Sequence, residues 1–304
     1  MKNYYRVTLG EGNSQAQDCF AGNYIGVGFG INEDLSHKLP EEWREFNKEF
    51  IPVYLSGHPG KSRIAAGLAC GAVWSVSKGF QNGDIVLCPD GEGHFHVGEI
   101  AGDYYYQPGT PLLHRRPVKW LNKTIARATL PDAVRKAIGV VGTYRSIASQ
   151  AEELEKLLGE SIPPISETIE DPLAFALEKH LEDFLVRNWS RTELGKEFDI
   201  YADEGEIAGQ QYETDTGPID ILAVSKDKKT LLVLELKKGR ASDVVVGQTL
   251  RYMGYVHEVL AERGQVVQGA IIALEDDQKI RRALAVSPNI SFYRYQVSFK
   301  LEKA

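Results

Sequence analysis

Apolar residues in the last two-fifths of the chain fall into two short runs separated by a charged turn. The runs cover residues 219–224 and 231–236, and both are rich in branched aliphatic side chains. Such runs, bounded by Gly217-Pro218 before the first and by polar residues 225–229 between them, are typical of a β-hairpin. The pattern predicts two paired, largely buried strands at the centre of this half of the chain.

Three charged residues interrupt this predicted hairpin: Asp220, Glu235 and Lys237. Charges in apolar strands are costly unless they pair with one another or bind a metal. Glu235 and Lys237 are two residues apart and project from the same face of their strand, and strand pairing can bring Asp220 beside them. Two carboxylates and a cation suit a hard divalent cation with a water or phosphate next to it. The alternative is a buried set of ion pairs.

The elements around the hairpin predict an α/β arrangement with a mixed sheet, because helices and strands alternate. In order, we expect a helix that opens at Asp171-Pro172, the hairpin, a helix at 243–261, a strand at 267–274, a helix at 278–284 and a strand at 291–299.

The sequences PID at 218–220 and ELK at 235–237 resemble the signature of PD-(D/E)XK nucleases. Their context resembles the C-terminal nuclease domain of the NucS (EndoMS) mismatch endonucleases. That context comprises Glu178 on a preceding helix, the stretch 212–217 leading into the hairpin, and residues 247–252 after it. The resemblance implies a PD-(D/E)XK nuclease domain that spans residues 166 to 304.

Asp220 and Glu235 would each give an oxygen to Mg²⁺ or Mn²⁺, and the carbonyl of Leu236 would add a third ligand. The metal would polarise the scissile phosphate and activate a bound water. Lys237 would orient that water or offset charge in the transition state.

The resemblance adds further residues to this site. Gln248 and Tyr252 are four residues apart, so they share a helix face, with Arg251 near them. The resemblance places both at the active site, where their polar groups suit a phosphate or a metal-bound water. Glu178 matches the acidic residue of the family's first helix, which would hold a second metal through water, and Glu182 is the alternative.

Residues 1–122 predict a separate, β-rich domain with helices at 40–50 and from Lys61 to Trp74. The order of its pieces is similar to PUA/EVE-like domains, which read modified bases at the front end of modification-dependent restriction enzymes. The matching pieces are residues 24–29, 82–86, 97–104 and 114–120.

Flipped-base pockets in that class use an aromatic sandwich and polar groups on the base edge. The resemblance therefore implies a modified-base pocket formed by Phe29, Trp74 and Tyr24, with Asp84 as the polar partner. The alternative is that these aromatic residues belong to the core. Between the halves, residues 123–165 predict a helical linker.

The chain has 304 residues, of which 43% are hydrophobic and 25% are charged, which is typical of globular proteins. Its net charge of −7 argues against a general nucleic-acid binder, but a nuclease with a local DNA grip remains compatible with it. Three scattered cysteines form neither a disulfide framework nor a zinc pattern. Without an apolar run of membrane length or a signal segment, we expect a cytoplasmic protein.

These observations together predict a Mg²⁺-dependent endonuclease that recognises modified double-stranded DNA with one domain and cuts it with the other. We expect a homodimer, or dimerisation on DNA, because cutting both strands usually needs two active sites. One alternative is a mismatch or branched-DNA endonuclease like NucS. The other is a DNA-binding protein with an inactive nuclease fold, against which the complete set of Asp220, Glu235 and Lys237 speaks.

Overall fold

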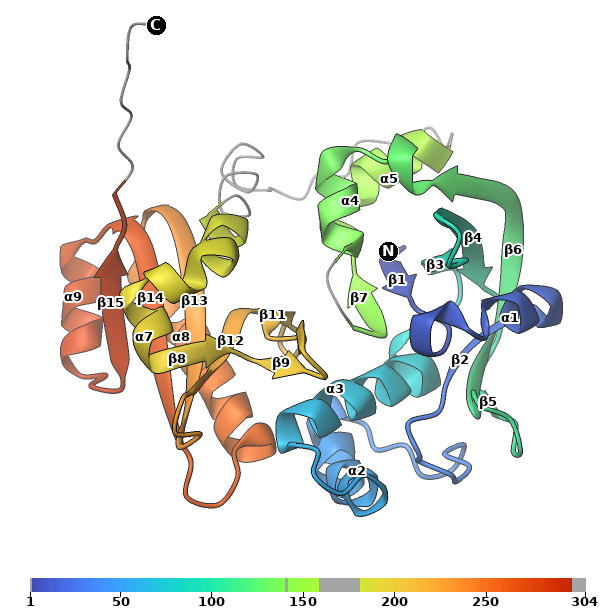
Figure 1. The fold of residues 1–304 in the computed structure, drawn as a ribbon, viewed down its shortest axis with the longest axis horizontal. Coiled ribbons are helices and arrows are strands. Elements are labelled where there is room, and N and C mark those ends of the chain that lie inside the picture. The colour runs from blue at the N-terminus through green and yellow to red at the C-terminus, as the bar shows by residue number, and fades with distance from the viewer. Residues whose placement is uncertain (1, 140–141, 159–180, 297–304) are drawn as a thin grey trace, which may run out of the picture. The chain divides into compact units, whose positions relative to one another are not determined.

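The computed structural model describes residues 2–139, 142–158 and 181–296. The chain divides into two compact units, Met1–Ile165 and Ser166–Ala304, which are described one at a time (Figure 1). Both units combine helices with β-sheet, which confirms the predicted mixture of α and β elements. Over the described ranges, no helix combines the length and apolarity needed to cross a membrane.

The first unit is built on a sheet with the strand order β2-β6-β4-β3-β1-β7, and β5 adds to β6. β1 and β3 run parallel, whereas the other neighbours are antiparallel. The strands are β1 (Tyr4–Val7), β2 (Tyr24–Val27), β3 (Ile85–Pro89), β4 (His94–Ile100), β5 (Tyr105–Tyr106), β6 (His114–Ala126) and β7 (Tyr144–Ser146).

The helices of the first unit are α1 (Ala16–Gly22), α2 (Trp43–Gly57), α3 (Arg63–Trp74), α4 (Asp132–Ile138) and α5 (Ala151–Leu158). The helix predicted at residues 40–50 is longer than expected, because Ile51 and Tyr54 continue the buried face that Phe46 and Phe50 begin. Ser62 caps α3, where its side chain accepts a hydrogen bond from the Ala65 N–H at 3.2 Å.

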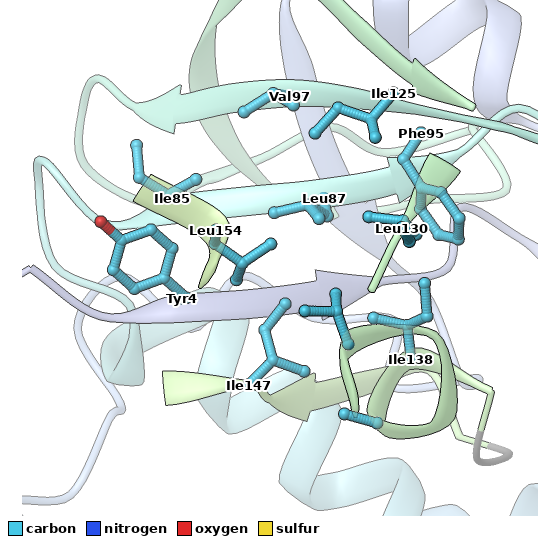
Figure 2. Packing of buried hydrophobic residues seen from close by; sticks show 12 residues of the cluster. Tyr4, Ile85, Leu87, Phe95, Val97, Ile125, Leu130, Ile138, Ile147 and Leu154 are labelled. Atoms are coloured by element: carbon cyan, nitrogen blue, oxygen red, sulfur yellow. The ribbon is translucent and has the colours of Figure 1, made fainter. Parts of the chain in front are cut away.

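The described residues 123–139 and 142–158 differ from the linker predicted over 123–165, because they contribute to the first unit's core. Leu130, which precedes α4, and Leu154 of α5 pack with Tyr4 and with apolar residues of β3 and β4 (Figure 2). Val134 of α4 belongs to the same cluster. β7 pairs with β1, and the Tyr4 hydroxyl donates a hydrogen bond to the Glu155 carboxylate of α5. The helices predicted for this stretch are present, but their apolar positions complete the core and do not form a separate linker.

All three cysteines lie in the first unit, and each is a buried, free thiol: Cys19, Cys70 and Cys88. Burial raises the pKa of Cys19 to about 11 and the pKa of Cys70 to about 12. Burial also raises the pKa of Cys88 well above its usual value.

The second unit contains a mixed sheet with the order β11-β12-β13-β14-β15. β8 pairs with the last three residues of β12, beyond the part of β12 that pairs with β11. β12 and β13 form the predicted antiparallel hairpin, while β13, β14 and β15 run parallel. The strands are β8 (Phe198–Ile200), β11 (Gln210–Tyr212), β12 (Ile219–Ser225), β13 (Thr230–Arg240), β14 (Val266–Glu275) and β15 (Ile290–Arg294), and a small hairpin joins β9 (Ala202–Asp203) to β10 (Glu206–Ile207).

Helices flank this second sheet, and the predicted helix at 243–261 is present. The helical parts are residues 181–188, α7 (Glu193–Glu197), α8 (Asp243–Tyr255) with the π-helical turn η6 (Val256–Leu260), and α9 (Gln278–Ala285).

The two faces of the hairpin have different neighbours. Ile221 and Leu234 face each other and belong to a core cluster that includes Leu185 from the helical segment 181–188. The opposite face carries Leu222 and Val233. Successive strand residues alternate between these faces, which decides where the charged residues of the hairpin project.

Helix α8 packs on the second of these faces. A Cβ added to Gly269 of β14 would lie 2.8 Å from the Thr249 and Met253 side chains of α8. Gly269 pairs with Val233, so it lies on the same face as Val233. The absence of a side chain at Gly269 therefore lets α8 lie close to the sheet.

Candidate active site

Asp220 and Glu235 lie at the same level of the β12–β13 hairpin. The pair Ile221 and Leu234 is in register, and one step further along the two strands lie Asp220 and Glu235. The Leu236 N–H donates a hydrogen bond to Asp220 Oδ2 at 2.8 Å, which fixes the carboxylate against β13. Alternation along the strands puts both carboxylates on the face that α8 covers.

Lys237 follows on this face, two residues beyond Glu235. Glu235 is only 1% exposed, whereas Asp220 and Lys237 are half-buried. The regular pairing of β13 with β14 ends after Lys237, where the register shifts. The cluster therefore combines a deeply buried carboxylate with two charged groups that solvent can reach.

Helix α8 brings Tyr252 to this cluster. Tyr252 is 3% exposed, and its hydroxyl lies 3.1 Å from the position that a Cβ on Gly217 would occupy. Burial raises the pKa of Tyr252, the charges of Glu235 and Asp220 raise this pKa further, and a side-chain hydrogen bond with Gln248 opposes the shift. The hydroxyl therefore keeps its proton and can donate a hydrogen bond.

An amide that the sequence analysis did not single out connects Asp220 to a further carboxylate. Gln211 Nε2 donates to Asp220 Oδ1 at 3.0 Å and to Glu182 Oε2 at 2.6 Å. Gln210 Nε2 donates to the other oxygen of Glu182 at 2.7 Å. Glu182 is 6% exposed, so neighbouring amides surround a buried carboxylate.

The backbone of Gln211 is left-handed, with a φ of 51°. A side chain in this conformation costs about 1–3 kcal/mol relative to ordinary strand geometry. The conformation breaks the alternation of β11, so that Gln210 and Gln211 both reach Glu182. The pairs Gln210–Ile221 and Tyr212–Ile219 set Gln211 opposite Asp220. The three-residue β11 gives no sequence pattern from which this register could be predicted.

Glu178 lies outside the described residues. Glu182, the alternative to it, is linked to Asp220 through Gln211. Across the described part of the chain, no group of three or more His, Cys, Asp or Glu side chains is arranged to hold a metal ion.

The donor set around Asp220 nevertheless fits Mg²⁺ or Mn²⁺. It consists of the carboxylates of Asp220 and Glu235 and the nearby carbonyl of Leu236, all of them hard oxygen donors. Mg²⁺ is usually held by one or two carboxylates, with water and substrate phosphate as its other ligands. Two carboxylates are therefore enough for this class of ion.

The side chains predicted to form the modified-base pocket have separate neighbours in the first unit. Trp74 packs against Phe46, with ring centroids 5.5 Å apart, and the Arg115 guanidinium lies 3.9 Å above the Tyr24 ring. Phe29 is half-buried, and its backbone is left-handed. Within the described ranges, the three rings make no ring contact with one another.

Asp84, the predicted polar partner, is 1% exposed and takes part in local hydrogen bonds. Its carboxylate accepts from the backbone N–H of Asn3 at 3.0 Å and of Gln81 at 2.9 Å. These contacts close the turn before β3 and join it to the start of β1. They explain the burial of Asp84 without a ligand, and the pocket stays a prediction.

A family model described as a domain of unknown function, DUF8426, matches residues 5–138. The matched region runs from β1 through α4 and so extends beyond residue 122. No curated protein matches the sequence.

Three similar solved structures are endonucleases. The first is a complex of EndoMS with double-stranded DNA, at 13% sequence identity and a TM-score of 0.33, and the match covers 71% of this chain and 66% of that one. The second is a repair endonuclease from Pyrococcus abyssi, at 15% identity and a TM-score of 0.31, with 68% of this chain and 66% of that one covered. The third is EndoMS in the apo form, at 15% identity and a TM-score of 0.32, with 71% of this chain and 79% of that one covered. The chain thus spans about two thirds of the length of the first two.

Proposed function

We propose that this protein is a metal-dependent DNA endonuclease whose active site is formed by Asp220, Glu235 and Lys237. The observation that carries the proposal is the register of the β12–β13 hairpin, which sets the two carboxylates side by side next to the lysine. A buried carboxylate such as Glu235, with a second acidic group beside it on an otherwise apolar sheet, is costly unless a cation offsets the charge.

Asp220, Glu235 and the Leu236 carbonyl would hold the divalent cation. When bound, such an ion polarises the scissile phosphate and lowers the pKa of a coordinated water. Lys237 would orient the attacking water or stabilise negative charge as it develops. The protonated hydroxyl of Tyr252 and the amide of Gln248 would donate hydrogen bonds to phosphate oxygens.

The finer part of the proposal is that the substrate is double-stranded DNA carrying a modified base, which the first unit recognises. Its support is the resemblance of residues 24–29, 82–86, 97–104 and 114–120 to PUA/EVE-like readers. Two copies of the chain, or dimerisation on DNA, would supply the two active sites needed to cut both strands. The alternative substrate is mismatched or branched DNA, as for NucS.

Cleavage assays on the full chain test the chemistry. With Mg²⁺ or Mn²⁺, the unsubstituted protein should cut duplex DNA, and chelation should stop it. Asp220→Asn, Glu235→Gln and Lys237→Ala should each abolish cutting. Melting should stay unchanged or rise for Glu235→Gln because like-charge repulsion is relieved, and Asp220→Asn, which loses an acceptor, should cost at most about 1–2 kcal/mol.

Two exposed residues of the same unit provide matched controls. Asp199→Asn removes a carboxylate on β8, and Lys229→Ala removes a lysine at the turn of the hairpin. Both should cut like the unsubstituted protein. Retained cutting by Asp220→Asn would contradict the assignment of the site.

A panel of matched duplexes that are unmodified, methylated, hydroxymethylated or mismatched then identifies the substrate. Preference for one modified duplex supports recognition by the first unit. Preference for the mismatch, with equal cutting of modified and unmodified DNA, would replace it with the NucS-like alternative.

A further inference from the structure

Gln211 joins two carboxylates through a single nitrogen. Its Nε2 is 3.0 Å from Asp220 Oδ1 and 2.6 Å from Glu182 Oε2. A primary amide nitrogen has two N–H groups, and ionised carboxylates only accept hydrogen bonds. One amide hydrogen is thus directed to each carboxylate, which sets the orientation of the amide.

Glu182 provides a fixed point for this link. It is 6% exposed and also accepts a hydrogen bond from Gln210 at 2.7 Å. Its helical segment, residues 181–188, is anchored by Leu185 in the core cluster of the hairpin. The position of Gln211 is therefore fixed by packed elements on both sides.

Asp220 is held from two directions. Gln211 donates to its Oδ1, while the Leu236 N–H donates to its Oδ2 at 2.8 Å. Donors on both oxygens restrict rotation of a carboxylate about its side-chain bonds. Partners that hold metal-binding carboxylates in this way strongly affect metal affinity and activity.

The backbone at Gln211 is a second, independent observation. Its φ of 51° is unfavourable for most residues other than Gly, Asn and Asp. Strained residues of this kind are retained where surrounding structure over-determines them, and they concentrate at functional sites.

We propose that Gln211 is a positioning residue, which holds the Asp220 carboxylate in the orientation that binds the cation by linking it to the buried Glu182. The inference depends on the proposed function, since it concerns the same site. Gln211 acts through Asp220 and does not contact the reacting phosphate.

The test compares one substitution at two adjacent residues of the full chain. Gln211→Met keeps the length of the side chain but removes both donors, whereas Gln210→Met removes only a donor to Glu182. Mn²⁺ binding without DNA is followed by the electron paramagnetic resonance signal of the free ion, and kcat and KM are measured on duplex DNA with Mg²⁺. Gln211→Gly, which relieves the left-handed backbone, serves as a second variant that favours folding.

We expect both Gln211 variants to weaken Mn²⁺ binding roughly 10–100-fold and to lower kcat similarly, with KM for DNA unchanged. Gln210→Met should have a clearly smaller effect. Equal effects at the two positions, or Gln211 variants that bind Mn²⁺ and cut like the unsubstituted protein, would overturn the positioning role and leave the nuclease assignment intact. An unsubstituted protein that neither binds Mn²⁺ nor cuts DNA would instead overturn the proposed function, and this inference with it.

Discussion

At the scale of single residues, burial shifts the pKa of polar side chains and so favours their uncharged forms. Tyr252 shows this in the second unit, where its buried position and the nearby carboxylates keep its hydroxyl protonated. His114 shows the opposite shift in the first unit. It is fully buried, and burial lowers the pKa of its imidazole from the usual 6.5.

Burial favours the neutral form of His114, and this form fits the hydrogen bonds around the ring. Nε2 lies 2.7 Å from the Ile31 carbonyl and must donate to it, so Nδ1 accepts from the Tyr104 hydroxyl at 3.0 Å. That hydroxyl accepts in turn from the Leu35 N–H. Protonation of Nδ1 would remove the acceptor of the Tyr104 hydroxyl and bury a charge in this chain of hydrogen bonds, which joins the loop after β2 to β6.

This arrangement predicts that acid destabilises the first unit. A histidine with a lowered folded pKa contributes fully above the unfolded value of 6.5, and the contribution is lost as the pH falls from 6.5 toward the folded pKa. The melting temperature of the protein should therefore decrease between pH 7.5 and pH 5.5. His114→Gln should melt lower at pH 7.5 but show a smaller decrease, and an unchanged pH dependence would contradict the role of His114.

At the scale of secondary-structure elements, the site depends on how closely α8 approaches the sheet. Gln248 and Tyr252 come from α8, while Asp220, Glu235 and Lys237 come from β12 and β13. The separation of these two sets of groups depends on how closely α8 packs against Gly269 of β14, which lies away from the site itself.

Gly269→Ala tests this dependence. The added methyl would lie 2.8 Å from Thr249 Cγ2 and Met253 Sδ, and the β-branched threonine has little freedom to move away. Overpacking of this kind costs about 1–3 kcal/mol. We expect a lower melting temperature together with reduced cutting, because α8 must shift. Gly247→Ala, on the exposed face of α8 with open space around it, is the control. It should leave cutting unchanged and should not lower the melting temperature, because alanine favours a helix more than glycine does.

The elements of this unit differ in how well the sequence predicts them. The hairpin and α8 are predicted by long apolar patterns of regular period, and they occur within a few residues of the expected ranges. β11 has only three residues, Gln-Gln-Tyr, and a left-handed φ at its centre, so no alternation marks it. For that reason the sequence did not predict a role for Gln211, although it did predict one for Asp220, which lies opposite it.

The predicted reader pocket shows a similar limit. The Asn82-Gly83-Asp84 turn was interpreted through a resemblance that made Asp84 a partner for a base. In the structure this carboxylate accepts hydrogen bonds from the backbone N–H of Gln81 in the turn and of Asn3, which directly precedes β1. Short polar side chains at turns often bond locally, and spacing alone does not distinguish that role from ligand binding.

At the scale of the whole molecule, the boundary of the first unit changes how the protein should be divided for experiments. The expected domain ended at residue 122, but Leu130, Val134, Ile147 and Leu154 are fully or almost fully buried in its core. β7 also covers the edge of β1. A fragment without these residues exposes apolar surface and a strand edge.

Fragment 1–122 is therefore expected to be unfolded or aggregated, and fragment 1–165 to fold. Loss of a buried leucine or isoleucine costs about 2–5 kcal/mol, so loss of Leu130, Ile147 and Leu154 alone costs an amount comparable to the whole stability of an ordinary domain. Circular dichroism and thermal melting of the two fragments check this expectation. A cooperative transition in fragment 1–122 would show that residues 123–158 are dispensable.

The burial of the three cysteines has a practical consequence for chemical labelling. The thiolate is the reactive form, and the raised pKa values of Cys19, Cys70 and Cys88 keep these thiols protonated. Their burial also keeps a reagent from reaching them. A cysteine introduced at an exposed position, such as Glu92→Cys or Glu206→Cys, should react with a maleimide dye far faster than the native three. Fluorophores or crosslinkers can thus be attached to either unit of the otherwise unaltered chain.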